Sequence, residues 1–593
     1  MEEGRMKKIA LGIDDFKEMI DKNTYFVDKS LFIKKILNNS SKVILLTRPR
    51  RFGKTLNLSM LKYFLEPSEI RDKNNKEIKD YSYLFEDLKI FQEREIVKKH
   101  LGRYPVITLS FKKVKAQKWK YARTAFKEAI AEEYLKYRHL LKSDVLLDFQ
   151  KEYFENIMSL RADIFQYTSA IKNLSLYLNQ YYHEKVFVLI DEYDTPLHYA
   201  KLNGYYQEML DIIRALMVDG LKGNENLEKG VVAGIMKLSQ ESIFSSFNNP
   251  KIASLTDSFC KEYFGFRKDE VSSLLEYYDL TSKKSMVNEW YNGYLFGGET
   301  VIYNPWSILS FVENEDHLLQ PYWINTGDTS LIKKSLQLDE KISKKYIKKL
   351  LTGEVLEKEV EQNIIYEDVF NNVEKAFSYL IHAGYLKAQR INNKDNKYQL
   401  SIPNREVRQI YIDILQNWFN REQKISELVT NLLDDLFALE IEQFAQDISS
   451  ILLTLSSYYD NVTDTQIKKT TEKNEIDRYE NFYHGLMLGI MVNITDQYHV
   501  FSNREFGMGR PDLVLFPKEK EQRAYILEFK NEYTSSPKAI ADIASQALKQ
   551  IKEKKYVPGI KKMGVNRVTK IGLGFKGKEV EVCWEDEENG KGF

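Results

Sequence analysis

Short apolar runs alternate with longer segments of helical pattern through the first half of the chain. After the first run, apolar residues recur at helical spacing from Leu56 to Leu65. After the second run, they do so over most of 119–182. Because strands that alternate with helices usually build a parallel sheet, this half predicts an α/β domain of that type. The runs that predict its buried strands are Val43 to Leu46, Pro105 to Phe111, Lys185 to Ile190 and Gly230 to Met236.

The middle of the chain, from Ser330 to Asp464, has a largely helical pattern rich in Lys, Glu, Leu and Ile. One part of it differs, because a helix there is followed by two short strands around a polar turn. That order is the pattern of a winged-helix module. Its predicted helix, helix stop, first strand, turn and second strand are residues 373–381, 382–384, 385–388, 392–396 and 398–402.

The pattern changes again near Arg478. An amphipathic helix over 479–490 precedes two strands, 511–516 and 524–530, and a second helix over 539–555. Side chains alternate along the second of these strands, so that Glu528 and Lys530 share one face. The last third therefore predicts a separate α/β domain.

Length and composition agree with several folded domains. At 593 residues the chain has room for about three or four. A hydrophobic fraction of 43% with 13% aromatic residues is enough to build their cores. We predict an α/β multidomain protein divided at 1–265, 266–465 and 466–593.

Charge and cysteine content narrow the class of protein. With 87 basic and 86 acidic side chains the net charge is +1, so any nucleic-acid site must be local. Cys260 and Cys583 are too few for a disulfide framework or a cysteine-rich zinc site, which fits a reducing compartment. Because the sequence has no signal-type core and no apolar run of about 18 residues, we expect a cytoplasmic protein that does not span a membrane.

The stretch from Val43 to Leu58 has the order of a phosphate-binding loop, with an apolar strand, a turn ending in Gly53-Lys54-Thr55 and a helix. Such a turn aims backbone amides and a helix amino terminus at a phosphate, while Lys54 and Thr55 reach the phosphate and its metal. Arg48 stands where the usual motif has glycine, so the motif alone leaves the nucleotide site open. The predicted nucleotide-binding residues are Arg51, Phe52, Gly53, Lys54, Thr55 and Leu56.

A second motif follows the third apolar run. Asp191 at the carboxyl edge of the sheet can hold Mg²⁺ through water, and Glu192 can polarise the attacking water. The alternative is a buried strand with acidic loop residues, but the motif order after Gly53 favours an NTPase. After the fourth run, Lys237 or Ser239 can sense the γ-phosphate, or the residues form a solvated strand end.

Several blocks of the first half resemble the AAA-ATPase-like family, over about residues 8 to 330. That family also has the Arg-Pro-Arg-Arg form of the loop, so Arg48 resembles a family trait. The resemblance implies ATP and Mg²⁺ as cofactors. It leaves open whether Arg50 and Arg51 contact phosphates, face a neighbouring subunit of a homo-oligomer or lie on the surface. The matching blocks are 48–55, 190–194, 242–249, 263–266, 290–294 and 303–307.

Two regions near this domain allow more than one interpretation. The aromatic blocks around Trp290 and Trp306 can stack on bases, or can form a packed subdomain, which we favour. The winged-helix-like module can bind DNA. Beside an ATPase domain, we favour its role as an intramolecular lid.

The C-terminal domain carries a second candidate site. Asp512 and Glu528, on adjacent strands, would bind Mg²⁺ through oxygen ligands. The metal and Lys530 would stabilise hydroxide and the charge on a phosphate under attack. Glu480 can add a third metal-binding carboxylate, and Gln546 can orient a water or the scissile phosphate.

The order Glu480, Asp512, Glu528 to Lys530 and Gln546 resembles the PD-(D/E)XK nuclease superfamily. A nuclease-like domain of this kind is commonly fused to the AAA-ATPase-like family. The resemblance implies a restriction-endonuclease-like fold. The plainer alternative is a Glu and Lys paired on a solvated strand face. The nearby lysines either contact phosphates or form a solvated helix face: Lys549, Lys552, Lys554, Lys555, Lys561 and Lys562.

The leading hypothesis is an ATP-binding and ATP-hydrolysing protein coupled to a Mg²⁺-dependent nuclease that cuts DNA. One alternative is an ATP-dependent signalling or scaffold protein whose nuclease-like domain binds without cutting. Another is a nuclease with a nucleotide-binding half that does not hydrolyse. The sequence does not distinguish DNA from RNA or endonuclease from exonuclease, and it identifies no sequence preference, trigger, subunit number or arginine finger.

Overall fold

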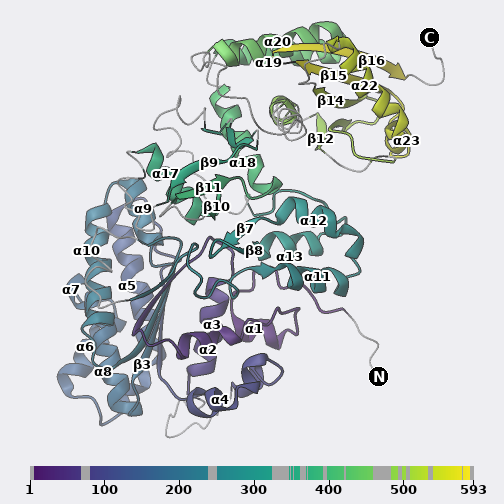
Figure 1. Ribbon diagram of the computed structural model, residues 1–593. Coiled ribbons are helices and arrows are strands. Elements are labelled where there is room, and N and C mark those ends of the chain that lie inside the picture. The colour runs from purple at the N-terminus through teal and green to yellow at the C-terminus, as the bar shows by residue number, and fades with distance from the viewer. Residues whose placement is uncertain are drawn as a thin grey trace, which may run out of the picture. The chain divides into compact units, whose positions relative to one another are not determined.

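The computed structural model forms two compact units (Figure 1), residues 1–339 with 357–407 and residues 340–356 with 408–593. The predicted division differs from this. Residues 266–323 belong to the same unit as the phosphate loop, and helices before residue 466 belong to the second unit. The structure describes residues 6–67, 81–237, 250–323, 346–347, 349–351, 353–360, 369, 372–391, 397–419, 423–457, 483–491, 494, 497–502, 506, 508–531, 539–576 and 578–587.

A five-stranded parallel sheet lies at the centre of the first unit, in the order β2-β3-β4-β1-β5. Every residue of β1 and β3 is buried, as expected where helices cover both faces of a sheet. The four predicted strands are confirmed, and a short fifth one is added. The strands are β1 (Val43–Thr47), β2 (Val106–Ser110), β3 (Val186–Asp191), β4 (Leu227–Gly234) and β5 (Lys251–Ala253).

Helices cover both faces of this sheet (Figure 1), with α1 to α3 on one side and α5 to α8 and α10 on the other. The predicted helical stretch 119–182 is divided into several helices. The helices are α1 (Phe16–Asp21), α2 (Leu31–Leu37), α3 (Lys54–Leu65), α4 (Arg94–His100), α5 (Trp119–Lys136), α6 (Asp148–Met158), α7 (Ile164–Thr168), α8 (Ala170–Tyr182), α9 (Thr195–Asn203) and α10 (Tyr206–Met217).

Residues 266–313 pack as a small subdomain of the same unit. An antiparallel sheet in the order β6-β8-β7 combines with three helices around a core that includes Tyr291 and Phe311. The elements are β6 (Phe266–Arg267), α11 (Lys268–Tyr277), α12 (Lys284–Tyr291), β7 (Tyr294–Phe296), β8 (Thr300–Tyr303) and α13 (Pro305–Glu313).

The predicted helix and two-stranded wing are both present. They form α17 (Val373–His382), β10 (Lys387–Arg390) and β11 (Lys397–Ser401), and β10 and β11 pair antiparallel. A third strand, β9 (Leu356–Glu359), completes a sheet in the order β10-β11-β9. We call residues 372–391 with 397–401 the wing module; the predicted turn at 392–396 lies outside the described residues.

The second unit is a mixed five-stranded sheet between two layers of helices, in the order β12-β13-β14-β15-β16. One face packs on α19, α20 and the helical stretch 483–491, and the other on α22 and α23. Its elements are α19 (Gln423–Ala438), α20 (Ile441–Ser457), β12 (Tyr498–Ser502), β13 (Leu513–Pro517), β14 (Ala524–Asn531), α22 (Ile540–Glu553), α23 (Tyr556–Lys561), β15 (Val568–Lys576) and β16 (Glu579–Glu587).

Helix α18 (Arg405–Phe419) begins at the end of the first unit and continues into the second. The predicted fold class is confirmed, with a parallel sheet, a helical and wing-containing middle and a C-terminal α/β sheet. Among the described residues, no helix is long and apolar enough to cross a membrane.

Candidate functional site

The strand order brings the two predicted NTPase motifs to one edge of the first sheet. β4 separates β1 from β3, and the carboxyl ends of all three strands point the same way. There the Thr55 hydroxyl donates a hydrogen bond of 2.6 Å to Asp191 Oδ2. The two residues predicted to hold Mg²⁺ from this half are therefore in direct contact.

Lys54 is buried against the loop that precedes it. Its ammonium group donates to the backbone carbonyls of Arg48 and Pro49, at 2.8 Å each. Burial lowers the pKa of Lys54, and the carboxylates of Asp191, Asp194 and Glu192 oppose that shift. The cation is thus held inside a cluster of acids at the amino end of α3.

The turn into α3 depends on Gly53. Its φ of +84° lies in the left-handed region that glycine adopts without a side-chain clash. Arg51, two residues earlier, has a φ of +67°. This backbone path puts the loop directly before the amino terminus of α3, where unpaired amides attract anions.

The acidic motif shows both burial and backbone strain. Burial raises the pKa of Asp191 to about 6, although the Thr55 hydrogen bond and Lys54 act in the other direction. Glu192 has a φ of +52°, a conformation that is costly outside glycine and often marks functional sites. Its backbone N donates to Asp191 Oδ1 at 2.9 Å, and its Oε2 accepts from Thr195 Oγ1 at 2.9 Å.

Asp194 is a residue of this site that the sequence analysis did not single out. It is buried, and its Oδ2 accepts from the backbone N of Ile235 at 2.7 Å. This bond fixes the segment after β4, where the predicted sensor Lys237 follows. Lys237 is half-buried, and burial lowers its pKa. Among the described residues, its place after the end of β4 is what joins Lys237 to the site, and Ser239 lies outside these residues.

Arg48, the residue in place of glycine, is fully buried. Its guanidinium donates to the carbonyls of Thr47, Ala253 and Phe259, at 2.8, 2.6 and 3.2 Å. The rings of Phe264 and Phe296 lie 5.2 and 5.1 Å from it. Burial lowers its pKa to about 10. Arg48 therefore anchors the start of the loop from behind and is not exposed to a ligand.

Side chains later in the loop pack on the aromatic blocks. Phe52 is buried against Tyr294 and Phe296, with ring centroids 5.1 and 5.4 Å away. The Arg51 guanidinium lies 3.7 Å from the Trp306 ring. The side chains of Phe52 and Arg51 are thus engaged by aromatic residues, so only their backbone N–H groups remain as candidate phosphate ligands. Leu56 is half-buried in the first turn of α3. The contacts favour the packed-subdomain interpretation of Trp306.

The wing module packs directly on the phosphate loop. A Cβ atom added at Gly384 would lie 3.0 Å from the Cβ of Pro49. One residue later, Tyr385 packs on Trp323 with ring centroids 5.1 Å apart, and Trp323 meets the edge of Tyr294 at 6.2 Å. The loop and the module therefore share one aromatic cluster, which favours the lid interpretation.

Glu406, at the start of α18, is fully buried in the same region. It accepts hydrogen bonds from the Ser307 hydroxyl at 2.7 Å and the Trp323 backbone N at 2.6 Å. Burial raises its pKa to about 7. The first turn of α18 is thus fastened to the subdomain beside the phosphate loop.

In the second unit, strand pairing brings Asp512 and Glu528 together. Leu513 pairs with Leu527 in the antiparallel register of β13 and β14, so the preceding Asp512 lies opposite Glu528. Asp512 Oδ2 accepts from the Phe529 backbone N at 2.8 Å, and Asp512 N donates to Glu528 Oε2 at 3.3 Å. Lys530 is half-buried two residues beyond Glu528, on the same strand face.

Helix α22 completes this site through Gln550. The Gln550 amide donates to Glu528 Oε1, whereas the predicted Gln546 is exposed one turn earlier. Tyr556 is buried nearby, and burial together with the Glu528 charge raises its pKa to about 12. The sequence analysis named Gln546 and not Gln550, which lies four residues later on the same helix face.

Two glycines of β15 let α22 approach. Gly572 pairs with Glu528, and a Cβ there would lie 2.5 Å from the Ala544 carbonyl oxygen of α22. At Gly574, which pairs with Lys530, a Cβ would lie 2.7 Å from the Ala544 backbone N. These close contacts set how near Gln550 lies to the carboxylates.

His484 is another residue that sequence reasoning missed. Its Nε2 lies 2.9 Å from the Asp512 carbonyl oxygen and 2.9 Å from Ser502 Oγ. His484 belongs to the helical stretch 483–491, just after Glu480, which lies outside the described residues. The sequence did contain a clue to this role, because His484 lies on the same predicted helix as Glu480, the predicted metal ligand.

Metal binding depends on few ligands here. In the part of the chain that the structure describes, no three His, Cys, Asp or Glu residues gather as a metal cluster. Asp512 and Glu528 nevertheless present carboxylate oxygens, and Mg²⁺ prefers oxygen ligands and keeps several waters. The hydroxyl and carboxylate oxygens of Thr55 and Asp191 also fit Mg²⁺, so the donor chemistry of both sites suits this ion.

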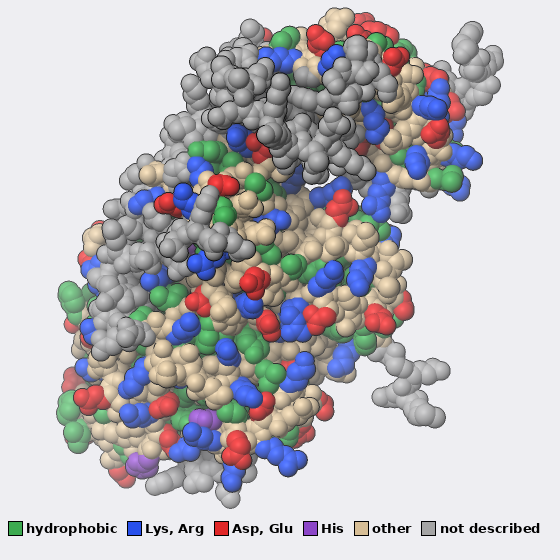
Figure 2. Space-filling view, in the orientation of Figure 1, with side chains coloured by type: hydrophobic (Ala, Val, Ile, Leu, Met, Phe, Trp, Pro, Cys, Tyr) green, Lys and Arg blue, Asp and Glu red, His purple; other side chains and the backbone are tan. Residues whose placement is uncertain are grey.

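Part of the predicted basic run is engaged in ion pairs. Lys552 and Lys570 both pair with Glu585, and Lys549 lies 3.7 Å from Glu553. On the part of the second unit that Figure 2 shows in colour, exposed basic and acidic side chains are interspersed. The paired lysines fit the solvated-face interpretation, while Lys554 and Lys555 are exposed.

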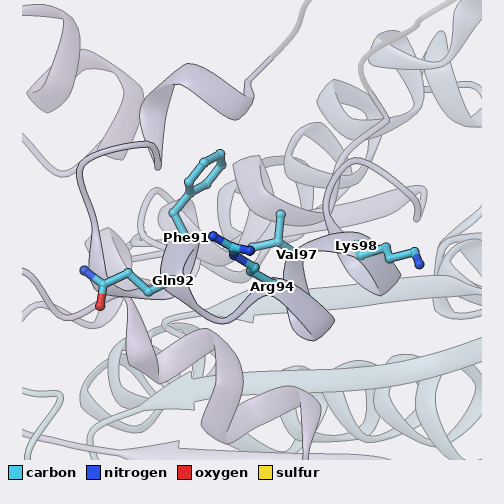
Figure 3. Close-up of a pocket in the computed structure, with 5 residues that line it drawn as sticks. All are labelled: Phe91, Gln92, Arg94, Val97 and Lys98. Carbon is cyan, nitrogen blue, oxygen red and sulfur yellow. The ribbon is translucent and has the colours of Figure 1, made fainter.

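A surface cavity of about 510 Å³ lies beside α4 (Figure 3), lined by Phe91, Gln92, Arg94, Val97 and Lys98. The chain after α4 returns to the carboxyl end of α3, where Gly102 N donates to the Phe64 carbonyl at 2.9 Å. The phosphate loop lies at the amino end of that helix. This cavity is therefore distinct from the candidate nucleotide site.

Comparison with known proteins supports both halves. Residues 10–244 match the family described as predicted AAA-ATPase, and residues 478–585 match the PD-(D/E)XK nuclease superfamily. The chain is also 24% identical over 564 residues to an uncharacterized protein in the vnfD 5′ region of Azotobacter chroococcum mcd 1, with 93% of each chain covered. The resemblance predicted from the motifs is confirmed: an AAA-ATPase-like segment precedes a PD-(D/E)XK nuclease-like segment in this chain.

Proposed function

We propose that this protein binds and hydrolyses ATP in its first unit and cuts DNA in its second, with Mg²⁺ as the metal of both sites. The observation that carries the proposal is the pairing of Asp512 with Glu528, with Lys530 on the same strand face. The Thr55 to Asp191 hydrogen bond supports the ATPase half in the same way.

In the ATPase half, the chain supplies phosphate binding and water activation. The loop amides and Lys54 bind the phosphates, and Glu192 accepts a proton from the attacking water. Thr55 and Asp191 would hold Mg²⁺, which neutralises phosphate charge when bound. The wing module, packed on Pro49, keeps solvent from one side of the loop.

In the nuclease half, Asp512 and Glu528 would hold the metal, which lowers the pKa of a bound water. Lys530 donates to the phosphate oxygen that gains charge as water attacks. Gln550 orients Glu528 through its amide, and His484 positions Asp512 through the backbone carbonyl.

A specific observation favours a second candidate function, in which the nuclease-like unit binds nucleic acid without cutting. Glu528 is 1% exposed, and both of its oxygens are already engaged, by Gln550 and by the Asp512 backbone. Each oxygen keeps a second lone pair, but a metal would have to reach a carboxylate that has almost no exposed surface. The same geometry fits a nuclease that is inactive until it is triggered.

One experiment tests the proposal. Purified protein is incubated with linear, circular and single-stranded DNA and with RNA, with and without ATP and Mg²⁺, beside the Lys530→Ala variant. We expect Mg²⁺-dependent cleavage of DNA by the wild type alone. Equal cleavage by both proteins would sink the nuclease assignment, and binding without cleavage would support the second candidate. Phosphate release, measured in parallel, separates hydrolysis from nucleotide binding alone.

A further inference from the structure

One large apolar side chain is exposed just before the candidate metal ligands of the second unit. Met508 has 69% of its surface exposed, and three residues separate it from Asp512. Apolar side chains that are exposed singly are common, so exposure alone assigns no role to Met508. The contacts of its neighbours, however, place it beside the candidate site.

Met508 belongs to a turn whose base is anchored in the core. Phe506 and Gly509 pair as an antiparallel bridge, in which Phe506 N donates to the Gly509 carbonyl oxygen at 3.0 Å. Phe506 is 3% exposed and packs in the core formed with α22 and α23. We call Phe506, Met508 and Gly509 the Met508 turn. Its base is therefore fixed, while its apolar side chain lies in solvent.

The Met508 turn is bound to the carboxyl end of α22. Met508 N donates to the Lys554 carbonyl oxygen at 2.8 Å. A Cβ atom added at Gly509 would lie 3.2 Å from Lys554 Cδ and 3.2 Å from Tyr556 Cε1. The aliphatic part of Lys554 and the ring of Tyr556 therefore lie against the turn, and glycine at position 509 leaves room for both.

The same helix reaches the candidate metal ligands one turn earlier. Lys554 N donates to the Gln550 carbonyl oxygen at 3.0 Å, and the Gln550 amide donates to Glu528 Oε1. Residues four apart on a helix share a face and lie about 6 Å apart along its axis. Contacts thus run without a gap from Met508, through α22, to Glu528.

The charge beside the Met508 turn is positive. Lys554 is exposed, and among the residues that the structure describes its side chain has no acidic partner. By contrast, Lys552 on the same helix pairs with Glu585, and Lys549 lies 3.7 Å from Glu553. Lys554 is therefore a cation near the candidate site that is available to bind a phosphate.

We propose that the Met508 turn and Lys554 hold a DNA strand beside the metal site, with Lys554 on a backbone phosphate and the Met508 side chain inserted between bases. The inference rests on the proposed nuclease function and states how that unit recognises its substrate. Methionine is among the apolar residues that proteins insert between base steps, and its sulfur makes favourable contacts with aromatic rings. It follows that the unit binds DNA most tightly where the bases unstack easily, as at pyrimidine–purine steps.

Fluorescence of 2-aminopurine tests the insertion, because this adenine analogue is quenched in a base stack and brightens when the stack opens. The probe is a short DNA duplex with 2-aminopurine at several positions. It is mixed with the whole chain in EDTA, or with Ca²⁺ in place of Mg²⁺, so that binding is measured without Mg²⁺-dependent cutting. Wild-type protein should raise the fluorescence. Met508→Ala should lose most of that rise, and its Kd for the duplex should be roughly three- to tenfold higher.

Two further variants control this measurement. Met508→Leu keeps an apolar side chain of similar size and should retain the rise in fluorescence. Met563→Ala removes another exposed methionine of the same unit and should behave as the wild type does. Circular dichroism checks that each variant is folded, as expected for substitutions of exposed side chains.

The salt dependence of binding tests Lys554. Each phosphate contact on duplex DNA contributes about 0.9 to the slope of log affinity against log salt concentration. Lys554→Ala should lower the slope by about that amount and weaken binding to every sequence alike. Lys549→Ala removes a lysine of the same helix that already lies near Glu553, and should leave the slope unchanged.

The outcomes separate failure of the inference from failure of the proposed function. A Met508→Ala protein that opens the bases as well as the wild type does would overturn the insertion. Equal slopes for Lys554→Ala and Lys549→Ala would overturn the phosphate contact. Both results leave the proposed nuclease in place if the wild type binds and cuts DNA. A wild-type protein that binds no DNA under any of these conditions would overturn the proposed nuclease together with the inference.

Discussion

The two candidate sites hold their carboxylates in different ways. In the first unit, Asp191 lies near the Lys54 ammonium and accepts hydrogen bonds from the Thr55 hydroxyl and the Glu192 backbone N. In the second unit, Asp512 and Glu528 are tied to backbone amides and to Gln550. In the first site, the Lys54 ammonium already interacts with the carboxylates of Asp191, Asp194 and Glu192. In the second site, backbone amides and Gln550 donate to the acids, and Glu528 has little exposed surface.

This difference suggests a division of roles. A site with balanced charges can bind and release its ligand repeatedly with little rearrangement. A pair of acids that already accepts hydrogen bonds and has little exposed surface is suited to a reaction that should occur only after a trigger. We therefore expect nucleotide binding to be readily detected and nuclease activity to depend on conditions.

The largest effect is expected from a substitution that disables the second candidate site and leaves the first intact. Lys530→Ala should reduce cleavage by about 10²- to 10³-fold, because it removes a donor to the charged phosphate, and should leave ATP turnover measurable. Gel-based cleavage and phosphate release are measured on the same preparation. Lys549→Ala, an exposed lysine of the same unit, is the matched control. Loss of both activities in Lys530→Ala would contradict separate sites.

The second prediction concerns a substitution that disables the first candidate site. Lys54→Ala should weaken ATP binding by roughly 10²-fold, since a buried charged donor is lost from the phosphate site. Calorimetry with a non-hydrolysed ATP analogue measures it, with Lys62→Ala at the far end of α3 as control. Unchanged binding in Lys54→Ala would remove the phosphate-loop interpretation.

The third prediction concerns the anchor behind the loop. Arg48→Met should destabilise the first unit by about 3 kcal/mol, because it leaves the carbonyls of Ala253 and Phe259 without a buried donor. Urea unfolding followed by tryptophan fluorescence measures the change. Lys113→Met removes an exposed charge and should cost less than about 0.5 kcal/mol. A stable Arg48→Met would show that the loop does not depend on this anchor.

The fourth prediction uses the buried acid at the start of α18. Because burial raises the pKa of Glu406 to about 7, the folded state binds this proton more tightly than the unfolded state does. Stability from this group is therefore present at low pH and is lost as pH rises toward 7, by about 2 kcal/mol between pH 5 and 7. Glu406→Gln should flatten that part of the pH profile in urea unfolding. An identical slope in the variant would refute the assignment.

The smallest effect is expected from a substitution that tests how α22 is positioned beside the second candidate site. Gly572→Ala places a Cβ 2.5 Å from the Ala544 carbonyl oxygen, which should push α22 and Gln550 away from Glu528. Cleavage should fall by a few fold, about 1 kcal/mol in the barrier, with ATP turnover unchanged. Ser545→Ala, at an exposed position of α22, is the control. Faster cleavage in Gly572→Ala would instead indicate that Gln550 restrains Glu528.

Residues that lie within contiguous motifs were predictable from the sequence. The apolar runs marked β1 to β4, and motif order identified Lys54, Thr55 and Asp191, which the structure brings together. The pair Asp512 and Glu528 was found in the same way, because strand alternation and motif order are local signals. Local periodicity also predicted the helix and the wing of the wing module.

Features that depend on long-range packing were not predictable. Whether Gln546 or Gln550 meets Glu528 depends on how closely α22 approaches β15, which Gly572 and Gly574 permit. His484 reaches Asp512 only because its helical stretch packs on one face of the second sheet. The extent of the units was also missed, since α19 and α20 share that core.

Arg48 has a consequence for how such a loop can change over generations. The usual glycine needs nothing from its neighbours, whereas this arginine is matched by three carbonyls and two phenylalanine rings. A single Arg48→Gly substitution would leave a cavity the size of the whole side chain and remove the donor from all three carbonyls at once. A stable loop with glycine at position 48 therefore requires further substitutions among the residues that surround Arg48. These surroundings restrict which residues position 48 can accept.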